Sequence, residues 1–159
     1  MSLGAGGGFP GLYAYSSKDQ KSTQVVKFGA EPQFSPDGKW IAYIVAPMRQ
    51  IIVQPFPGPG AHIQISNVSG SSQPRWSRDG RKLFYVQPDR KLMVVAFDPT
   101  KNSAGPPQVF AQTRIKVTTF GWFQYDISPD GRLLVNSLPA NNTSPLTLVT
   151  NWTAELKTR

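Results

Sequence analysis

The side chains most often used for nucleophilic or metal-assisted chemistry are scarce in this chain. His62 is the single histidine, cysteine is absent, and aspartate and glutamate together supply 9 of the 159 residues. A Ser-His-Asp triad needs a histidine beside a serine and a carboxylate, and no G-x-S-x-G elbow occurs. A zinc site needs several histidine or cysteine ligands. The sequence therefore predicts no catalytic residues, no metal site and no cofactor.

Polar residues that recur at equivalent places predict a binding surface instead. They precede three similar hairpins, where we expect the innermost strand of each unit to line a central channel. The entry positions are Glu31, Gln73 and Gln124, and the alternate positions are Gln33, Arg75 and Asp126. Converging strands would gather these side chains at one face and form a site for a protein or a small ligand. Two simpler alternatives stay open: the residues only hydrate the channel, or Arg75 pairs with Asp126 without a function.

One short phrase, repeated three times, would position these residues. It reads PQFSPDG at 32–38, PRWSRDG at 74–80 and YDISPDG at 125–131, so that its glycines lie 42 and then 51 residues apart. Asp-Gly between apolar runs is a strong hairpin signal, because Asp bonds the turn backbone and Gly accepts a positive φ. We therefore assign a structural role to the turn residues, which are Asp37, Gly38, Asp79, Gly80, Asp130 and Gly131. Three aspartates on three separate turns do not converge as a catalytic pair must.

The chain around these hairpins reads as short strands joined by turns. No window holds a helical apolar spacing without Pro or Gly interrupting it. The units fall at about 11–28, 29–66, 72–111 and 123–152, each with up to four strands, and the last expected strand is 146–152. Residues 1–10 read as a flexible leader or a cloning scar. The sequence predicts an all-β fold of four-stranded antiparallel meanders, a partial β-propeller with about three to four blades per chain.

Equivalent apolar positions in the three units predict packing between blades. Phe34, Trp76 and Ile127 share one expected register position, and a second is shared by Ile41, Leu83 and Leu134. Burial of each large apolar side chain is worth about 1.5 to 3 kcal/mol. A base-stacking platform would require these positions to face outward.

The Ser-Pro-Asp-Gly hairpins, together with Ile52–Gly60, Gln73–Gly80 and Leu148–Lys157, resemble the repeat of TolB-type propellers, which are relatives of WD-repeat propellers. The resemblance covers about residues 11–157 and is similar to the C-terminal blades of large bacterial proteins, some of which carry a protein kinase domain. It implies a periplasmic or extracytoplasmic location. Arg78 replaces the usual proline, and Tyr125-Asp126-Ile127 departs from the Pro-x-aromatic pattern.

Charge and blade number bear on partners. The net charge of +8 is spread over turns, so the sequence favours a solvated surface over a nucleic-acid site, and no apolar run is long enough for a membrane span. Three blades are fewer than the four to eight of typical propellers. We therefore expect copies to assemble, most simply as a dimer that closes a six-bladed ring, and the alternative is an open four-bladed arc.

These observations favour a binding module without enzymatic activity, forming the sensory or scaffolding part of a larger bacterial protein. The alternative is the gating propeller of a prolyl-oligopeptidase-like serine peptidase whose catalytic domain is absent from this chain.

Overall fold

The structure is a computed structural model that describes residues 10–58, 60–115 and 122–137. Every regular element in these residues is a β-strand, so the predicted all-β class is confirmed. The strands are β1 Leu12–Ser16, β2 Lys21–Val26, β3 Gly29–Phe34, β4 Trp40–Val45, β5 Gln50–Pro55, β6 Ile63–Gln64, β7 Ser72–Trp76, β8 Lys82–Val86, β9 Lys91–Asp98, β10 Ser103–Ala104, β11 Gln108–Gln112, β12 Tyr125–Ile127 and β13 Leu133–Val135. The strand expected at 146–152 and most of the leader lie outside the described residues.

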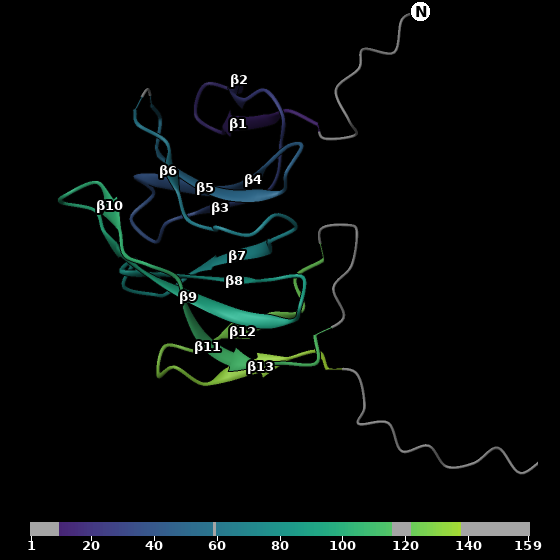
Figure 1. Cartoon of the computed structure of the whole chain (residues 1–159). Helices are drawn as coiled ribbons and strands as arrows, with labels where there is room; N and C mark the ends of the chain where they lie inside the picture. Colours follow the sequence, from purple (N-terminus) through teal and green to yellow (C-terminus); the bar gives the residue numbers. More distant parts are fainter. Residues whose placement is uncertain (1–9, 59, 116–121, 138–159) are drawn as a thin grey trace, which may run out of the picture.

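The strands form antiparallel sheets that stack in chain order. Strands β3 to β6 make a four-stranded meander, and the next sheet runs β7–β8–β9 with β10 and β11 both paired to β9. Two-stranded sheets, β1–β2 and β12–β13, lie at the two ends of the stack, as Figure 1 shows. Since β3, β7 and β12 are each the first strand of their sheet, the fold is part of a β-propeller.

Two apolar clusters hold neighbouring sheets together. The first joins β4 and β5 to β8 and β9, with Trp40 and Phe97 at its edge. Trp40 packs edge-on against Phe97 with ring centroids 5.0 Å apart, and Trp76 packs on the same ring at 5.1 Å. The second cluster joins β8 and β9 to β12 and β13 through Phe84, Ile115 and Tyr125. The sheet of β7 to β11 therefore buries one face against the sheet of β3 to β6 and the other against β12–β13.

The third hairpin corrects one sequence prediction. Ser35 and Ser77 donate their backbone N–H to the carbonyl five residues on, whereas Ser128 bonds the carbonyl of Arg132, four residues on. This turn is one residue shorter, so Leu133 pairs with Ile127 and occupies the register position expected for Leu134. Leu134 instead takes the register of Ala42 and Phe84 and is 76% exposed. The prediction for Leu134 was wrong because the shared letters of the phrase do not reveal the shorter turn.

A search of the described residues finds no helix long and apolar enough to cross a membrane.

Candidate functional site

Three of the predicted positions form a relay between the first strands of adjacent sheets. The backbone N–H of Gln73 donates to Glu31 Oε2 at 2.6 Å, and the backbone N–H of Gln124 donates to Gln73 Oε1 at 2.7 Å. Glu31 and Gln73 both have positive φ, at 53° and 59°, and lie where the register shifts between the first two strands. A left-handed backbone costs a residue with a side chain about 1 to 2 kcal/mol. The relay bonds hold these two bulges in place.

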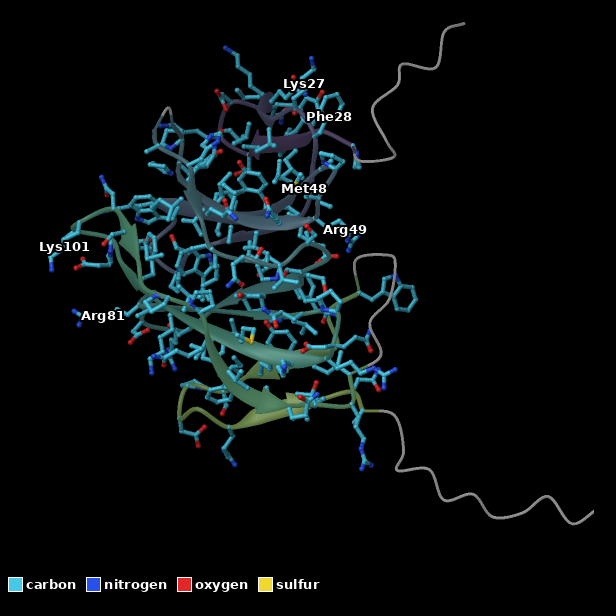
Figure 2. All side chains as sticks on the ribbon, viewed as in Figure 1. Lys27, Phe28, Met48, Arg49, Arg81 and Lys101 are labelled. Atoms are coloured by element: carbon cyan, nitrogen blue, oxygen red, sulfur yellow. The ribbon has the colours of Figure 1, made fainter. Side chains whose placement is uncertain are left out.

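Glu31 is the buried acid of this relay, with a side chain only 5% exposed. Burial raises the pKa of the Glu31 carboxyl above its ordinary value, and this effect outweighs the opposing bond from Gln73 and the Arg49 charge 3.7 Å away. Arg49 comes from the turn between β4 and β5 and lies at the opposite edge of the stack from Arg81 (Figure 2).

The alternate positions on β7 and β12 meet as an ion pair; the sheets that begin with β3, β7 and β12 are called the first, second and third sheets below. Arg75 Nη1 lies 3.6 Å from Asp126 Oδ1, and the Arg75 guanidinium stacks over the Phe123 ring at 4.4 Å. The Arg75 side chain is 28% exposed and that of Asp126 is 66% exposed. Both line an open hollow of about 390 Å³ that also includes Phe123, Gln124 and Asn136. This volume lies within the range of about 300 to 1,000 Å³ typical of small-ligand sites.

Tyr125 links the two strands that carry Arg75 and Asp126. Its hydroxyl donates to the Gln73 carbonyl at 2.7 Å and is buried between the second and third sheets. Burial raises the pKa of the Tyr125 phenol well above its usual value, so the group stays neutral and acts as a hydrogen-bond donor. The Gln124 side chain accepts a bond from Asn136 Nδ2 at 2.7 Å, which fixes the neighbouring strand.

Gln33 lies apart from the other predicted residues. Its backbone carbonyl accepts a bond from Trp76 Nε1 at 3.4 Å, and the residue lines a separate small cavity beside Phe34 and Ile41. The structure thus brings together Glu31, Gln73, Arg75, Gln124 and Asp126 at one end of the first strands, but not Gln33. Sequence reasoning missed Phe123 and Tyr125, although both adjoin Gln124, because it ranked only polar side chains.

The turn residues make local bonds. Ser35 Oγ donates to Asp37 Oδ1 at 2.5 Å and Ser77 Oγ to Asp79 Oδ1 at 2.6 Å, and Ser128 bonds Asp130 in the same way. These hydroxyl bonds are the main cause that lowers the pKa of all three carboxyls. The turn glycines have φ values of 70°, 69° and 84°, which glycine adopts without strain. The three carboxylates are held within their own turns rather than directed at a shared site.

His62 lies in a different hollow, of about 730 Å³, between the β1–β2 hairpin and the third strand of the first complete sheet. Its neighbours there include Tyr13, Tyr15, Phe34 and Phe56. Among the described residues no group of three or more His, Asp or Glu side chains could hold a metal ion. Polar side chains such as Asp19, Lys21 and Gln54 line the hollow together with these aromatic rings.

Comparison with solved structures supports the propeller class. The chain is similar to a proposed 6-phosphogluconolactonase from Bacteroides uniformis (19% identity, TM-score 0.50) and to another from Bacteroides fragilis (16%, 0.50). It is also similar to the periplasmic gluconolactonase of Pseudomonas aeruginosa (20%, 0.51). In each case the match covers 79% of this chain and 40% of the other, so the chain spans well under half of these structures. No protein-family model and no curated protein matches the chain.

These comparisons correct three sequence-based predictions. The assignment to TolB-type or WD-repeat propellers was wrong, because no family model matches and the structural neighbours are named as lactonases. The prediction of a binding module without enzymatic activity is overturned by the same neighbours, each of which is named as an enzyme. The alternative of a peptidase-gating propeller also finds no support among them.

Proposed function

We propose that the chain supplies an arc of a β-propeller that opens a sugar lactone, with Arg75 and Asp126 at the reacting site. The observation that carries this proposal is a cation and a carboxylate 3.6 Å apart that line one open hollow beside β7 and β12. The names of the three structural neighbours supply the substrate class.

The pair has the chemistry that ester hydrolysis requires. A water oxygen attacks the lactone carbonyl carbon, and its proton passes to the Asp126 carboxylate as general base. The Arg75 guanidinium stabilises the negative charge that develops on the carbonyl oxygen. The ring C–O bond then breaks, and the ring oxygen takes the proton from Asp126, which leaves an open-chain hydroxy acid.

Other residues of the site position this pair. Glu31 fixes the Gln73 bulge, and Arg75 follows two residues later on the same strand. Gln73 and Tyr125 then join the second sheet to the third, which carries Asp126. Because Phe123 stacks on the guanidinium, the cation is held in one orientation rather than free to rotate.

The partner in this proposal is a second copy of the chain, which completes the ring around the channel. The site would then face a closed channel that limits access of bulk water. A dimer in solution, with twice the 17.5 kDa chain mass, is the expected state.

The test measures hydrolysis of glucono-δ-lactone and of its 6-phosphate by the whole chain. A pH-stat records the rate of acid release, and the spontaneous rate without protein is subtracted. We expect Asp126→Asn to lower kcat/KM by about 10² to 10⁴-fold and Arg75→Gln by about 10² to 10³-fold. The matched controls are Arg81→Gln, from the opposite edge of the stack to Arg49, and Asp98→Asn, at the end of β9. These controls should keep full activity. Hydrolysis at the spontaneous rate with both lactones would overturn the proposal.

A further inference from the structure

The contact between the two complete sheets follows a rule that the third sheet repeats. A side chain at the relay position of one sheet accepts the backbone N–H of the next, as Glu31 does from Gln73 and Gln73 does from Gln124. Alternate residues of the second strand face the successor: Ala42 is buried against the second sheet and Phe84 against the third. The aromatic pair of the second sheet, Trp76 and Phe97, is covered by Trp40 of the sheet before it.

At the start of the stack, the described residues place no tryptophan over the equivalent aromatic pair. Phe34 and Phe56 pack edge-on with centroids 4.9 Å apart, as Trp76 and Phe97 do. Phe34 is nevertheless 56% exposed and borders the 730 Å³ hollow under the β1–β2 hairpin. Within the described chain, the place that Trp40 takes between the complete sheets is open space here.

At the end of the stack, the successor-facing position of the third sheet is exposed. Leu134 has the register of Ala42 and Phe84 but is 76% exposed, and Asp126 beside it is also open. Gln124 is the next acceptor in the relay. Its Oε1 receives one bond from Asn136 and, as an amide oxygen with two lone pairs, can accept a second.

The two end hairpins are complementary halves of one sheet. Strand β2 leads into the first strand β3 as β6 leads into β7, so β1 and β2 occupy the third and fourth places of a sheet. Strands β12 and β13 occupy the first and second places of another. In the part of the chain that the structure describes, β1 pairs with β2 and β13 pairs with β12, and the two hairpins lie at opposite ends of the stack (Figure 1).

We infer that β12–β13 of one copy and β1–β2 of a second copy join edge to edge, with β13 beside β1, to form a complete four-stranded blade. This inference deepens the proposed function, which takes a second copy as the partner, by naming the surfaces through which the two copies join. Leu134 of one copy then packs toward the Phe34–Phe56 pair of its partner, and Gln124 accepts the backbone N–H of the partner's Glu31.

The count of blades agrees with a closed ring. The described residues of each copy form two complete sheets and two hairpins, so two copies joined in this way would present four complete and two composite blades. A two-fold arrangement uses both ends of each copy and leaves no sheet edge open between them.

The test compares Leu134→Asp and Phe34→Asp with Val109→Asp in the full chain. All three side chains are exposed, at 76%, 56% and 58%, so a charge at any of them should be tolerated by the folded copy. We expect the first two variants to raise the dimer Kd by about tenfold or more, measured by sedimentation and light scattering, and Val109→Asp on β11 to leave it unchanged. Circular dichroism checks that each variant stays folded.

Hydrogen exchange gives an independent measure of edge pairing. The backbone amides of β1 and β13 should be protected in the dimer and should exchange faster in Leu134→Asp. A monomeric full chain at tens of micromolar, or a dimer that both aspartate variants leave intact, would overturn the inference. Lactone hydrolysis by a monomer would overturn this interface while leaving the proposed function standing, and a ring-shaped dimer without hydrolysis would do the reverse.

Discussion

Replacing the buried acid Glu31 with glutamine tests the account of the relay most directly. Gln73 occupies the equivalent position of the next sheet and accepts the backbone N–H of Gln124 through its amide oxygen, so an amide already performs this role in the same chain. In Glu31→Gln the amide oxygen can still accept the Gln73 N–H that now lies 2.6 Å from the carboxylate. The variant removes the buried charge but keeps the bond.

The magnitude follows from two opposing terms. A hydrogen bond to a charged acceptor is worth about 1.5 to 3 kcal/mol and one to a neutral acceptor about 0.5 to 1.5, so the exchange loses about 1 kcal/mol. The raised pKa of Glu31 shows that desolvation of the charge outweighs its favourable contacts. Each unit of that rise costs about 1.4 kcal/mol once the group is ionised. We therefore expect Glu31→Gln to match or exceed the parent stability at pH 8.

The pH dependence has a definite sign. Because the folded pKa is above the unfolded one, the folded state binds the proton more tightly, and Glu31 favours folding below its unfolded value near 4.5. This contribution is lost as pH rises through the folded pKa. The advantage of Glu31→Gln should therefore be absent at pH 4 and present at pH 8.

Urea unfolding followed by tryptophan fluorescence at both pH values measures these differences. Glu31→Ala is the matched comparison: it leaves the buried Gln73 N–H without its acceptor and should cost about 1 to 3 kcal/mol at either pH. A Glu31→Gln variant more than 1 kcal/mol less stable than the parent at pH 8 would refute this reasoning. So would equal effects of glutamine and alanine.

Three further predictions concern packing and turns. Trp40→Ala should cost about 3 to 5 kcal/mol in urea unfolding because Trp40 is 6% exposed between two sheets, whereas Trp122→Ala, at 73% exposure, should change stability by less than about 0.5 kcal/mol. Gly38→Ala should lower the melting temperature, since φ is 70° there although a Cβ would meet no atom within 4 Å, and Gly105→Ala, which makes only ordinary contacts, should not. Asp37 has a lowered pKa, so its contribution is present above the unfolded value and lost as pH falls; in acid titrations of stability Asp37→Asn should therefore show a shallower decline than the parent.

The hairpins were the most predictable part of the fold. The motif Ser-x-Asp-Gly predicts a turn from sequence alone, because the bonds of the serine hydroxyl and the aspartate, and the positive φ of the glycine, all lie within a few residues. The length of the third turn was not readable, and Leu134 was therefore given the wrong face. A difference of one residue reverses the side of a strand that every following side chain occupies.

The candidate site was only partly predictable. The suggested pairing of Arg75 with Asp126 is present, because both residues precede their hairpins by the same number of positions in adjacent sheets. Gln33 also shares that position but lies at the start of the stack, where its place in the sequence does not reveal its neighbours. Arg49 reaches Glu31 from a turn of unrelated sequence, so no spacing rule could have indicated it. The incorrect TolB assignment came from the Ser-Pro-Asp-Gly turn sequences. These sequences indicate a hairpin and carry no information about the reaction or the ligand.

The relay also explains how the chain tolerates growth. Its two links span 42 and 51 residues, a difference of nine, yet the two bonds have nearly the same length. The added residues lie between Gln73 and Gln124, where the chain runs outward through the later strands of the second sheet before it returns. Extra residues in the later strands and loops of a sheet therefore leave the bonds between the first strands unchanged. The outer loops can vary in length and sequence while the relay keeps its spacing.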